Sequence, residues 1–251
     1  MAQQQSRTVS LGRSLNCRDV GGYPTADGRT VRWGLLYRSD LPVLDDEHEP
    51  ELEAISLNTV IDLREPEERA ARPSSAVGRV PRVLDMSFGL GPIVAADPAK
   101  AASLRVLYRS AILELGSQIA DIVSELCRPE ALPALVHCAA GKDRTGIVIG
   151  LVLSAIGVSD ADVAGDYAVT TDNLTTQFFD DLNGDAHTAR VDLTSLLGAD
   201  AQEMLHLLDL VREVAGDARS YLVGHGVDPD GLDRLCDSLS SCSPRSQTAR
   251  P

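Results

Sequence analysis

The sequence predicts an α/β fold: a central, partly parallel sheet flanked by helices, with a functional loop between one strand and one helix. Two observations support this prediction. Short apolar runs typical of buried strands alternate with longer segments whose apolar residues recur at helical spacing. In addition, the apolar run ALPALV leads directly into HCAAGKDRTG at residues 137–146, where a new apolar stretch begins. Ligands of such sheets tend to bind beyond the carboxyl ends of the strands, which is where this loop lies.

Composition favours one globular domain. The 251 residues are 43% hydrophobic and 24% charged, a balance typical of a chain with a real core. We expect the domain to occupy residues 1–239. The remainder, 240–251, reads SSCSPRSQTARP and predicts a flexible C-terminal tail.

Net charge and segment lengths exclude several classes of partner. The net charge of -14 argues against nucleic acid and against an anionic membrane. The start of the chain, MAQQQSRTVS, lacks the apolar stretch of a classical signal peptide. The longest apolar run, 146–158, is too short to span a bilayer, so we expect no stable membrane insertion. These features predict a cytoplasmic location or export without a classical signal, and they leave the oligomeric state open.

No metal site is expected. The five Cys are odd in number and form no CxxC pair, and the five His show no HExxH spacing. Reduced thiols and an absence of cofactors are therefore the expectation.

In the first third of the chain, the sequence predicts mainly strands. Residues 21–40 contain the turn signal ADGR between two short apolar segments, which indicates a hairpin. A helix is predicted at 45–57, a buried strand at 59–63 and a short strand within 79–88.

The rest of the chain predicts mainly helices. Residues 99–127 carry apolar side chains at helical spacing, and Pro129 and Pro133 follow as helix breakers. A strand at 135–137 then leads through the loop into a buried helix at 145–156. Further helices are predicted at 160–173 and 201–214.

The loop has the parts needed to bind and attack a phosphate. A helix N-terminus offers unpaired N–H groups and partial positive charge, and Gly141 and Gly146 permit tight curvature around an oxyanion. The same field favours a thiolate at Cys138, which makes this residue a candidate nucleophile. Six residues further along, the planar guanidinium of Arg144 could return to grip two phosphate oxygens. Attack would form a phosphocysteine.

The remaining loop residues have supporting roles in this interpretation. Ala139 and Ala140 supply backbone around the phosphate, Lys142 adds charge for a second phosphate, and Thr145 could hydrogen-bond the sulfur as it leaves. Plainer alternatives exist. A random Cys is most often a small buried hydrophobe, and Asp143 could simply cap the helix. His137 is expected to orient the loop by bonding to backbone.

The sequence HCAAGKDRTG resembles the active-site loop of the Cys-dependent protein tyrosine phosphatase superfamily. The likeness extends to a bacterial branch with a secreted mycobacterial member. It rests on NCRDVGGY near the start, TVIDLREPEERA, and GDARSYLVGHGVDPDGLDRL near the end. The chain departs from that branch at Cys17, where an aromatic residue is usual, and at Ala139 beside the nucleophile.

The resemblance implies a phosphatase α/β fold that works without a metal. It implies activity on phosphotyrosine proteins, with phosphoserine, phosphothreonine or phosphoinositides as further substrates, and a helical lid at about 171–198. An acid must protonate the leaving group, because a phenolate has a conjugate-acid pKa of about 10. By resemblance this acid is Asp143, with Asp85 on a separate segment as the alternative.

Two rival functions remain. One is a catalytically silent phosphate-binding module, although such modules usually lack the Cys or the Arg. The other is a rhodanese-like sulfurtransferase, whose Cys loop does not require the sequence GKDRTG. Outside the loop, two charged pairs are interpreted as structural ion pairs: Asp62 with Arg64, and Arg18 with Asp19.

Overall fold

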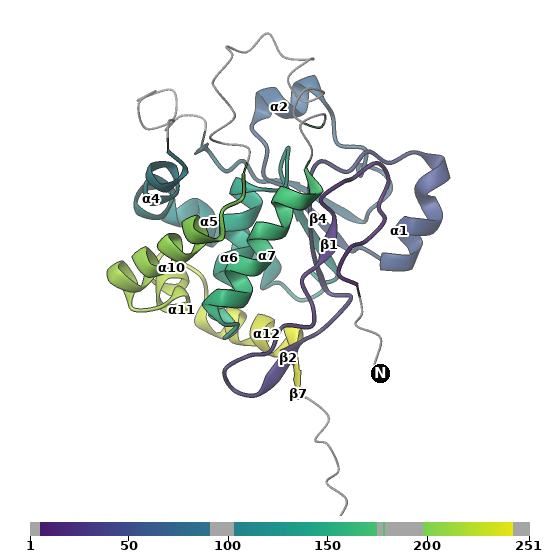
Figure 1. Ribbon diagram of the computed structural model, residues 1–251. Helices are drawn as coiled ribbons and strands as arrows, with labels where there is room; N and C mark the ends of the chain where they lie inside the picture. Colours follow the sequence, from purple (N-terminus) through teal and green to yellow (C-terminus); the bar gives the residue numbers. More distant parts are fainter. Residues whose placement is uncertain (1–5, 91–102, 175–177, 179–197, 243–251) are drawn as a thin grey trace, which may run out of the picture.

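A five-stranded sheet forms the centre of the molecule in the computed structural model, which describes residues 6–90, 103–174, 178 and 198–242 (Figure 1). Its strand order is β1-β3-β6-β4-β5. The strands β3, β6, β4 and β5 run parallel, and β1 pairs antiparallel with β3, so the predicted partly parallel α/β sheet is confirmed. The strand bounds are β1 Arg18–Asp19, β3 Leu36–Ser39, β6 Ala134–His137, β4 Thr59–Asp62 and β5 Arg82–Asp85.

The sheet register aligns the carboxyl ends of the parallel strands. Ser39 and Asp62 both lie opposite His137, and Asp85 lies opposite Asp62. Since β6 is the middle strand, the residue that follows it emerges at the centre of this edge. The loop at 137–146 therefore occupies the position predicted for it.

Helices cover both faces of the sheet, because successive side chains on a buried strand point to opposite faces. On β6, Ala134 and Val136 belong to the larger core, whereas Leu135 belongs to a smaller core with Leu52 and Leu57. The larger core is formed by α4 Leu104–Glu114, α5 Gly116–Leu126, α6 Asp143–Ala155, α7 Asp160–Asn173, α10 Ala201–Ala215, α11 Ala218–Gly224 and α12 Pro229–Leu239. The short helices η1 Asp46–His48, α1 Glu49–Ile55 and α2 Pro66–Ala71 complete the fold.

The helix predicted at 99–127 is two helices, with residues 99–102 outside the described part of the chain. The break falls between α4 and α5, where Leu115 has φ -115° and ψ 18°. A Cβ on Gly116 would come within 2.1 Å of the His225 ring. The chain thus bends at Leu115, directly before Gly116, whose missing side chain leaves room for His225 at the end of α11.

The predicted hairpin at 21–40 is only partly correct. The turn forms, because Gly28 donates to the carbonyl of Thr25 and Pro24 bridges to Thr30. The strand after the turn, β2 Arg29–Val31, instead finds its ladder partner in β7 Ser240–Cys242.

This pairing also corrects the predicted tail, whose first three residues, 240–242, belong to the fold. Leu239 is fully buried at the end of α12, and its carbonyl accepts from the N–H of Arg32, so the next residues start beside β2. The remaining tail lies outside the described residues.

Most of the expected lid lies outside the described residues as well, at 175–177 and 179–197. Residues 171–173, at its start, complete α7, and Ala199, the residue that follows its end, exchanges hydrogen bonds with the hydroxyl of Thr171. Among the described helices, none is long and apolar enough to cross a membrane.

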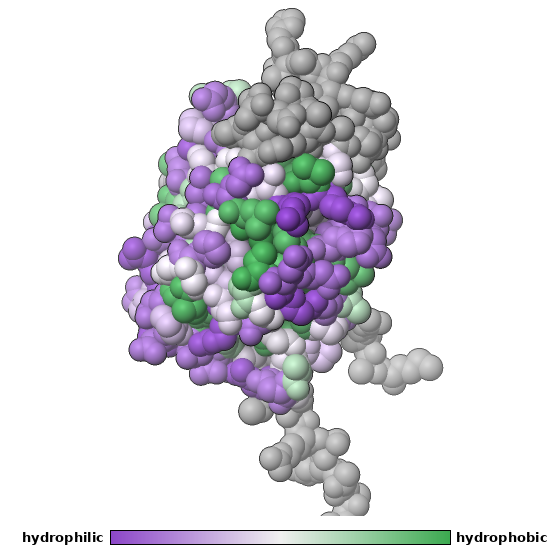
Figure 2. Space-filling view, turned by 90° about the vertical axis from the view of Figure 1, so that its left-hand side faces the viewer, coloured by the Kyte–Doolittle hydropathy of each residue, from purple (hydrophilic) through white to green (hydrophobic). Residues whose placement is uncertain are grey.

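The outer face formed by α4 and α10 mixes hydrophobic and hydrophilic side chains (Figure 2). A groove of about 280 Å³ lies there, lined by Leu207 and Leu210 of α10 and by Tyr108 of α4. Charged side chains border it, including Arg105 and Arg109.

Candidate active site

The loop places a cysteine between a strand and a helix N-terminus, as predicted. Cys138 follows β6 directly, and α6 begins at Asp143 with Lys142 as its N-cap. Cys138 is 3% exposed, so it lies at the base of the loop. Arg144 is in the first turn of the helix.

Three successive carbonyls of the loop are held from outside it. The carbonyl of Ala139 accepts from the N–H of Leu41 at 3.0 Å, and that of Ala140 accepts from the Asn16 side-chain amide at 3.0 Å. The carbonyl of Gly141 accepts from Arg38 Nη2 at 2.8 Å. In a trans peptide the N–H points opposite to the C=O. The N–H groups that follow these carbonyls are therefore turned toward the inside of the loop, where an anion would sit.

Both glycines are required by close packing. Gly141 has φ +65°, and a Cβ there would lie 2.3 Å from the carbonyl oxygen of Ser39. A Cβ on Gly146 would lie 2.9 Å from the ring of Tyr167. The tight curvature expected from the sequence is thus present, and β3 and α7 pack closely against the two glycines.

The guanidinium of Arg144 is oriented by a carboxylate. Its Nη1 and Nη2 donate to Glu68 at 2.5 and 2.8 Å, in the two-pronged geometry typical of arginine with a planar oxyanion. Burial lowers the pKa of Arg144. The hydrogen bond to Glu68 and the charge of the nearby Cys138 raise this pKa by more than burial lowers it, so the net shift is upward. Arg144 is therefore a permanent cation beside Cys138.

A second charge cluster, formed by Arg18, Arg38 and Asp166, is fully buried next to the loop. Asp166 of α7 accepts from Arg18 Nε at 3.2 Å and from Arg38 Nη1 at 2.5 Å. Each of the three side chains is at most 2% exposed. Since Arg38 also holds the carbonyl of Gly141, this cluster connects α7 to the loop.

The sequence-based pairing of Arg18 with Asp19 is wrong. Adjacent residues of a strand point to opposite faces, so these two side chains cannot meet. Asp19 instead accepts from the N–H groups of Gly21 and Gly34 at 2.7 and 2.6 Å. Sequence reasoning also missed Arg38, Asp166 and Glu68, whose partners are far away in the chain.

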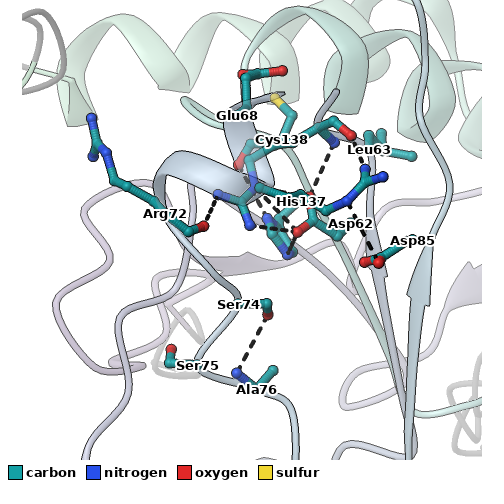
Figure 3. Close-up of polar contacts among 12 residues, drawn as sticks. Asp62, Leu63, Glu68, Arg72, Ser74, Ser75, Ala76, Asp85, His137 and Cys138 are labelled. Carbon is teal, nitrogen blue, oxygen red and sulfur yellow. Dashed lines mark hydrogen bonds and ion pairs between the residues drawn. The ribbon is translucent and has the colours of Figure 1, made fainter. Parts of the chain in front are cut away.

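His137 has the expected structural role. Its Nδ1 donates to the carbonyl of Cys138 at 3.1 Å, and its Nε2 lies 3.8 Å from Asp62 Oδ2 (Figure 3). Burial lowers the pKa of His137, and the charge of Asp62 only partly offsets this. The predicted pair of Asp62 and Arg64 is confirmed, with Arg64 Nη2 2.6 Å from Asp62 Oδ2.

The two candidate acids have different surroundings. Asp143 Oδ1 accepts a hydrogen bond from the hydroxyl of Tyr108 at 2.7 Å, and its side chain is 29% exposed. Asp85 is 60% exposed, two strands away from His137, and faces Arg69 at 3.6 Å (Figure 3). Asp143 does not cap the helix, because the N-cap is Lys142 and no side-chain cap bond is formed there.

The side chains of two supporting loop residues, Lys142 and Thr145, are buried. The side chain of Lys142 is 3% exposed, and its Nζ donates to the carbonyl of Gly198 at 3.4 Å and lies 3.6 Å from Asp143 Oδ1. The hydroxyl of Thr145 is buried and has no hydrogen-bond partner among the described atoms. Within the described ranges, no group of His, Cys, Asp or Glu could hold a metal ion.

The model of the tyrosine phosphatase family matches residues 9–241. This match covers nearly all of the described chain, and the chain belongs to that family.

Curated relatives carry phosphatase names. A Cupriavidus necator protein, provisionally named a tyrosine-protein phosphatase, is 33% identical over 61% of this chain and 59% of its own length. The triple specificity protein phosphatase PtpB of Mycobacterium tuberculosis is 32% identical over 65% of this chain and 69% of its own. The alignment thus spans less than two thirds of the first relative.

The solved structures that match are more distant. The catalytic core of Siw14 covers 93% of this chain and 95% of its own, with 14% identity and a TM-score of 0.41.

Proposed function

We propose that the protein hydrolyses phosphate monoesters through a phosphocysteine intermediate. One observation carries this proposal. Three successive loop carbonyls are bound by groups outside the loop, which frees the N–H groups that follow them for an anion, and Glu68 holds the guanidinium of Arg144 near Cys138. These groups match the three equatorial oxygens of a transferring phosphoryl group.

In the first step, the Cys138 thiolate attacks phosphorus as the ester P–O bond breaks. The electron pair of that bond goes to the leaving oxygen, which takes a proton from an acid, and an S–P bond forms. Inward N–H groups and Arg144 stabilise the charge on the equatorial oxygens.

In the second step, water attacks phosphorus and the S–P bond breaks, which returns the thiolate and releases inorganic phosphate. The carboxylate left by the first step accepts the proton of the water, so the acid is restored. The positive charge of Arg144 and the helix N-terminus favour the departing thiolate.

We propose Asp143 as the acid, because it lies in the loop itself and its side chain is 29% exposed. Asp143→Asn is expected to lower kcat about 10²–10³-fold on an alkyl phosphate and only a few-fold on p-nitrophenyl phosphate, whose leaving group needs little protonation. Asp85→Asn is the matched control, with changes of less than about two-fold expected. If Asp143→Asn lowered kcat equally on both esters, Asp143 would not be the acid.

The function itself is tested with Cys138→Ser. We expect loss of at least about 10⁴-fold in kcat on phosphotyrosine peptide, since an un-ionised hydroxyl replaces the thiolate. Cys236→Ser, a buried cysteine of α12 far from the loop, is the control and should retain activity. Unchanged hydrolysis in Cys138→Ser would contradict the mechanism. Binding of phosphate ligands without any hydrolysis by the wild type would instead show a silent binding module.

Phosphotyrosine proteins are the proposed first substrate class, followed by phosphoserine, phosphothreonine and phosphoinositides. The family match and the name of the PtpB relative support this breadth. The buried position of Lys142 gives no direct support to a second-phosphate site. Side-by-side assays of the three substrate types, scored by kcat/KM, determine the order.

A further inference from the structure

A chain of two tyrosine hydroxyls ends on the proposed acid. Tyr108 of α4 donates to Asp143 Oδ1 at 2.7 Å, and the hydroxyls of Tyr108 and Tyr167 are 2.6 Å apart. Their rings meet edge to face, with centroids 6.2 Å apart and an interplanar angle of 79°. The chain therefore links α4 and α7 to the first residue of α6.

The direction of the chain follows from its proton count. A tyrosine hydroxyl has one proton, and Tyr108 gives its own to Asp143. Tyr167 must then donate to Tyr108. Each hydroxyl polarises the next, so the bond that reaches the carboxylate is strengthened.

The bond also determines which oxygen of Asp143 holds the acidic proton. Oδ1 already accepts from Tyr108 and has the Lys142 ammonium 3.6 Å away. A proton on Oδ1 would compete with both groups, whereas a proton on Oδ2 competes with neither. In its acid form Asp143 therefore offers its proton from Oδ2.

The tyrosines can act in this way at any working pH. Burial, followed by the charge of Asp143, raises the pKa of both phenols above the ordinary value of 10. Tyr108 and Tyr167 are 1% and 0% exposed, so water does not replace the bonds. Both hydroxyls stay protonated donors.

We propose that Tyr108 is a positioning residue for proton transfer, with Tyr167 acting behind it: the pair orients Asp143 so that Oδ2 delivers the proton to the leaving group. This inference rests on the proposed function and on Asp143 as the acid. The competing explanation is that two buried hydroxyls merely satisfy each other, as buried polar groups usually do.

The test compares Tyr108→Phe with Tyr167→Phe, each of which removes one hydroxyl from the same buried pair. For each variant, kcat and KM are measured on an alkyl phosphate and on p-nitrophenyl phosphate. Tyr108→Phe should lower kcat about 10-fold on the alkyl ester, the size of a lost bond to a charged group, and less than about 3-fold on the aryl ester. KM should be unchanged on both.

The second variant gives a second readout. Tyr167→Phe leaves the bond between Tyr108 and Asp143 in place. It should change the ester ratio, which is kcat on the alkyl ester divided by kcat on the aryl ester, in the same direction as Tyr108→Phe but by only about 2-fold. If Tyr108→Phe does not fold, this smaller shift still tests the proposal.

An added Tyr108→Phe change in the Asp143→Asn background should leave the ester ratio where Asp143→Asn alone put it. An unchanged ester ratio in both tyrosine variants, with stability lowered equally, would overturn the inference and leave the proposed function intact. A wild type that hydrolyses neither ester would overturn both.

Discussion

Two arginine–carboxylate systems flank the loop, and they differ in burial. Arg144 and Glu68 form a two-pronged pair whose side chains are 15% and 34% exposed. Arg18 and Arg38 share Asp166, and all three side chains are at most 2% exposed. The first system lies near Cys138, whereas the second holds the backbone of the loop through the carbonyl of Gly141.

The difference shows how one residue type performs two functions. Arg144 is held in place by Glu68 but remains open enough to meet a ligand. Burial and the neighbouring Arg38 lower the pKa of Arg18 to about 10, so the inner arginines depend on the charge of Asp166. We therefore expect changes in the outer pair to affect activity and changes in the inner cluster to affect stability.

The largest expected effect is on stability. Asp166→Asn leaves two buried guanidinium groups with no carboxylate between them, and breaking such a pair costs about 3–5 kcal/mol. Urea unfolding at pH 7 measures it. Asp209→Asn, which removes a carboxylate from an exposed pair with Arg212, is the control and should stay within about 0.5 kcal/mol. Equal losses in the two variants would contradict the comparison.

Arg144→Lys tests the outer pair. Lysine keeps the charge but loses the planar fork, so kcat/KM on phosphotyrosine peptide should fall about 10²–10³-fold. The free energy of unfolding should change by no more than about 1 kcal/mol, because the pair with Glu68 is partly exposed. A large loss of stability with normal activity would place Arg144 in the same role as Arg38.

The smallest effect is a pH dependence from His137. Its pKa is lowered by burial, so the unfolded chain binds the proton more readily. This contribution to stability is complete above about pH 6.5, the unfolded value, and is lost as pH falls toward the folded value, by up to about 1.4 kcal/mol per pH unit. Urea unfolding at pH 7, 6 and 5 measures it, and His137→Gln should flatten the profile.

The sequence predicted the parts of the site that are local in the chain. Cys138, Gly141 and Arg144 belong to one short segment between a strand and a helix, so their proximity follows from their spacing in the chain. The pair of Asp62 and Arg64 was also predictable, since residues two apart at a strand end point to the same side.

The remaining contacts depend on tertiary packing. Asp166 of α7 meets Arg38 of β3 across 128 residues of chain, and nothing near YRSD indicates that partner. Tyr108 and Asp143 lie 35 residues apart in the chain, and nothing in the sequence around Tyr108 indicates that its hydroxyl bonds to that carboxylate. Strand β2 has a turn beside it, yet its ladder partner comes from the other end of the domain.

That last pairing bears on how the chain is made. Strand β2 emerges from the ribosome early, but residues 240–242 emerge only after every other described element. Until then β2 presents an unpaired edge, which is a site for wrong pairing between nascent chains. For expression, a C-terminal purification tag is therefore better separated from β7 by a spacer placed after residue 242, so that this last strand can close the edge.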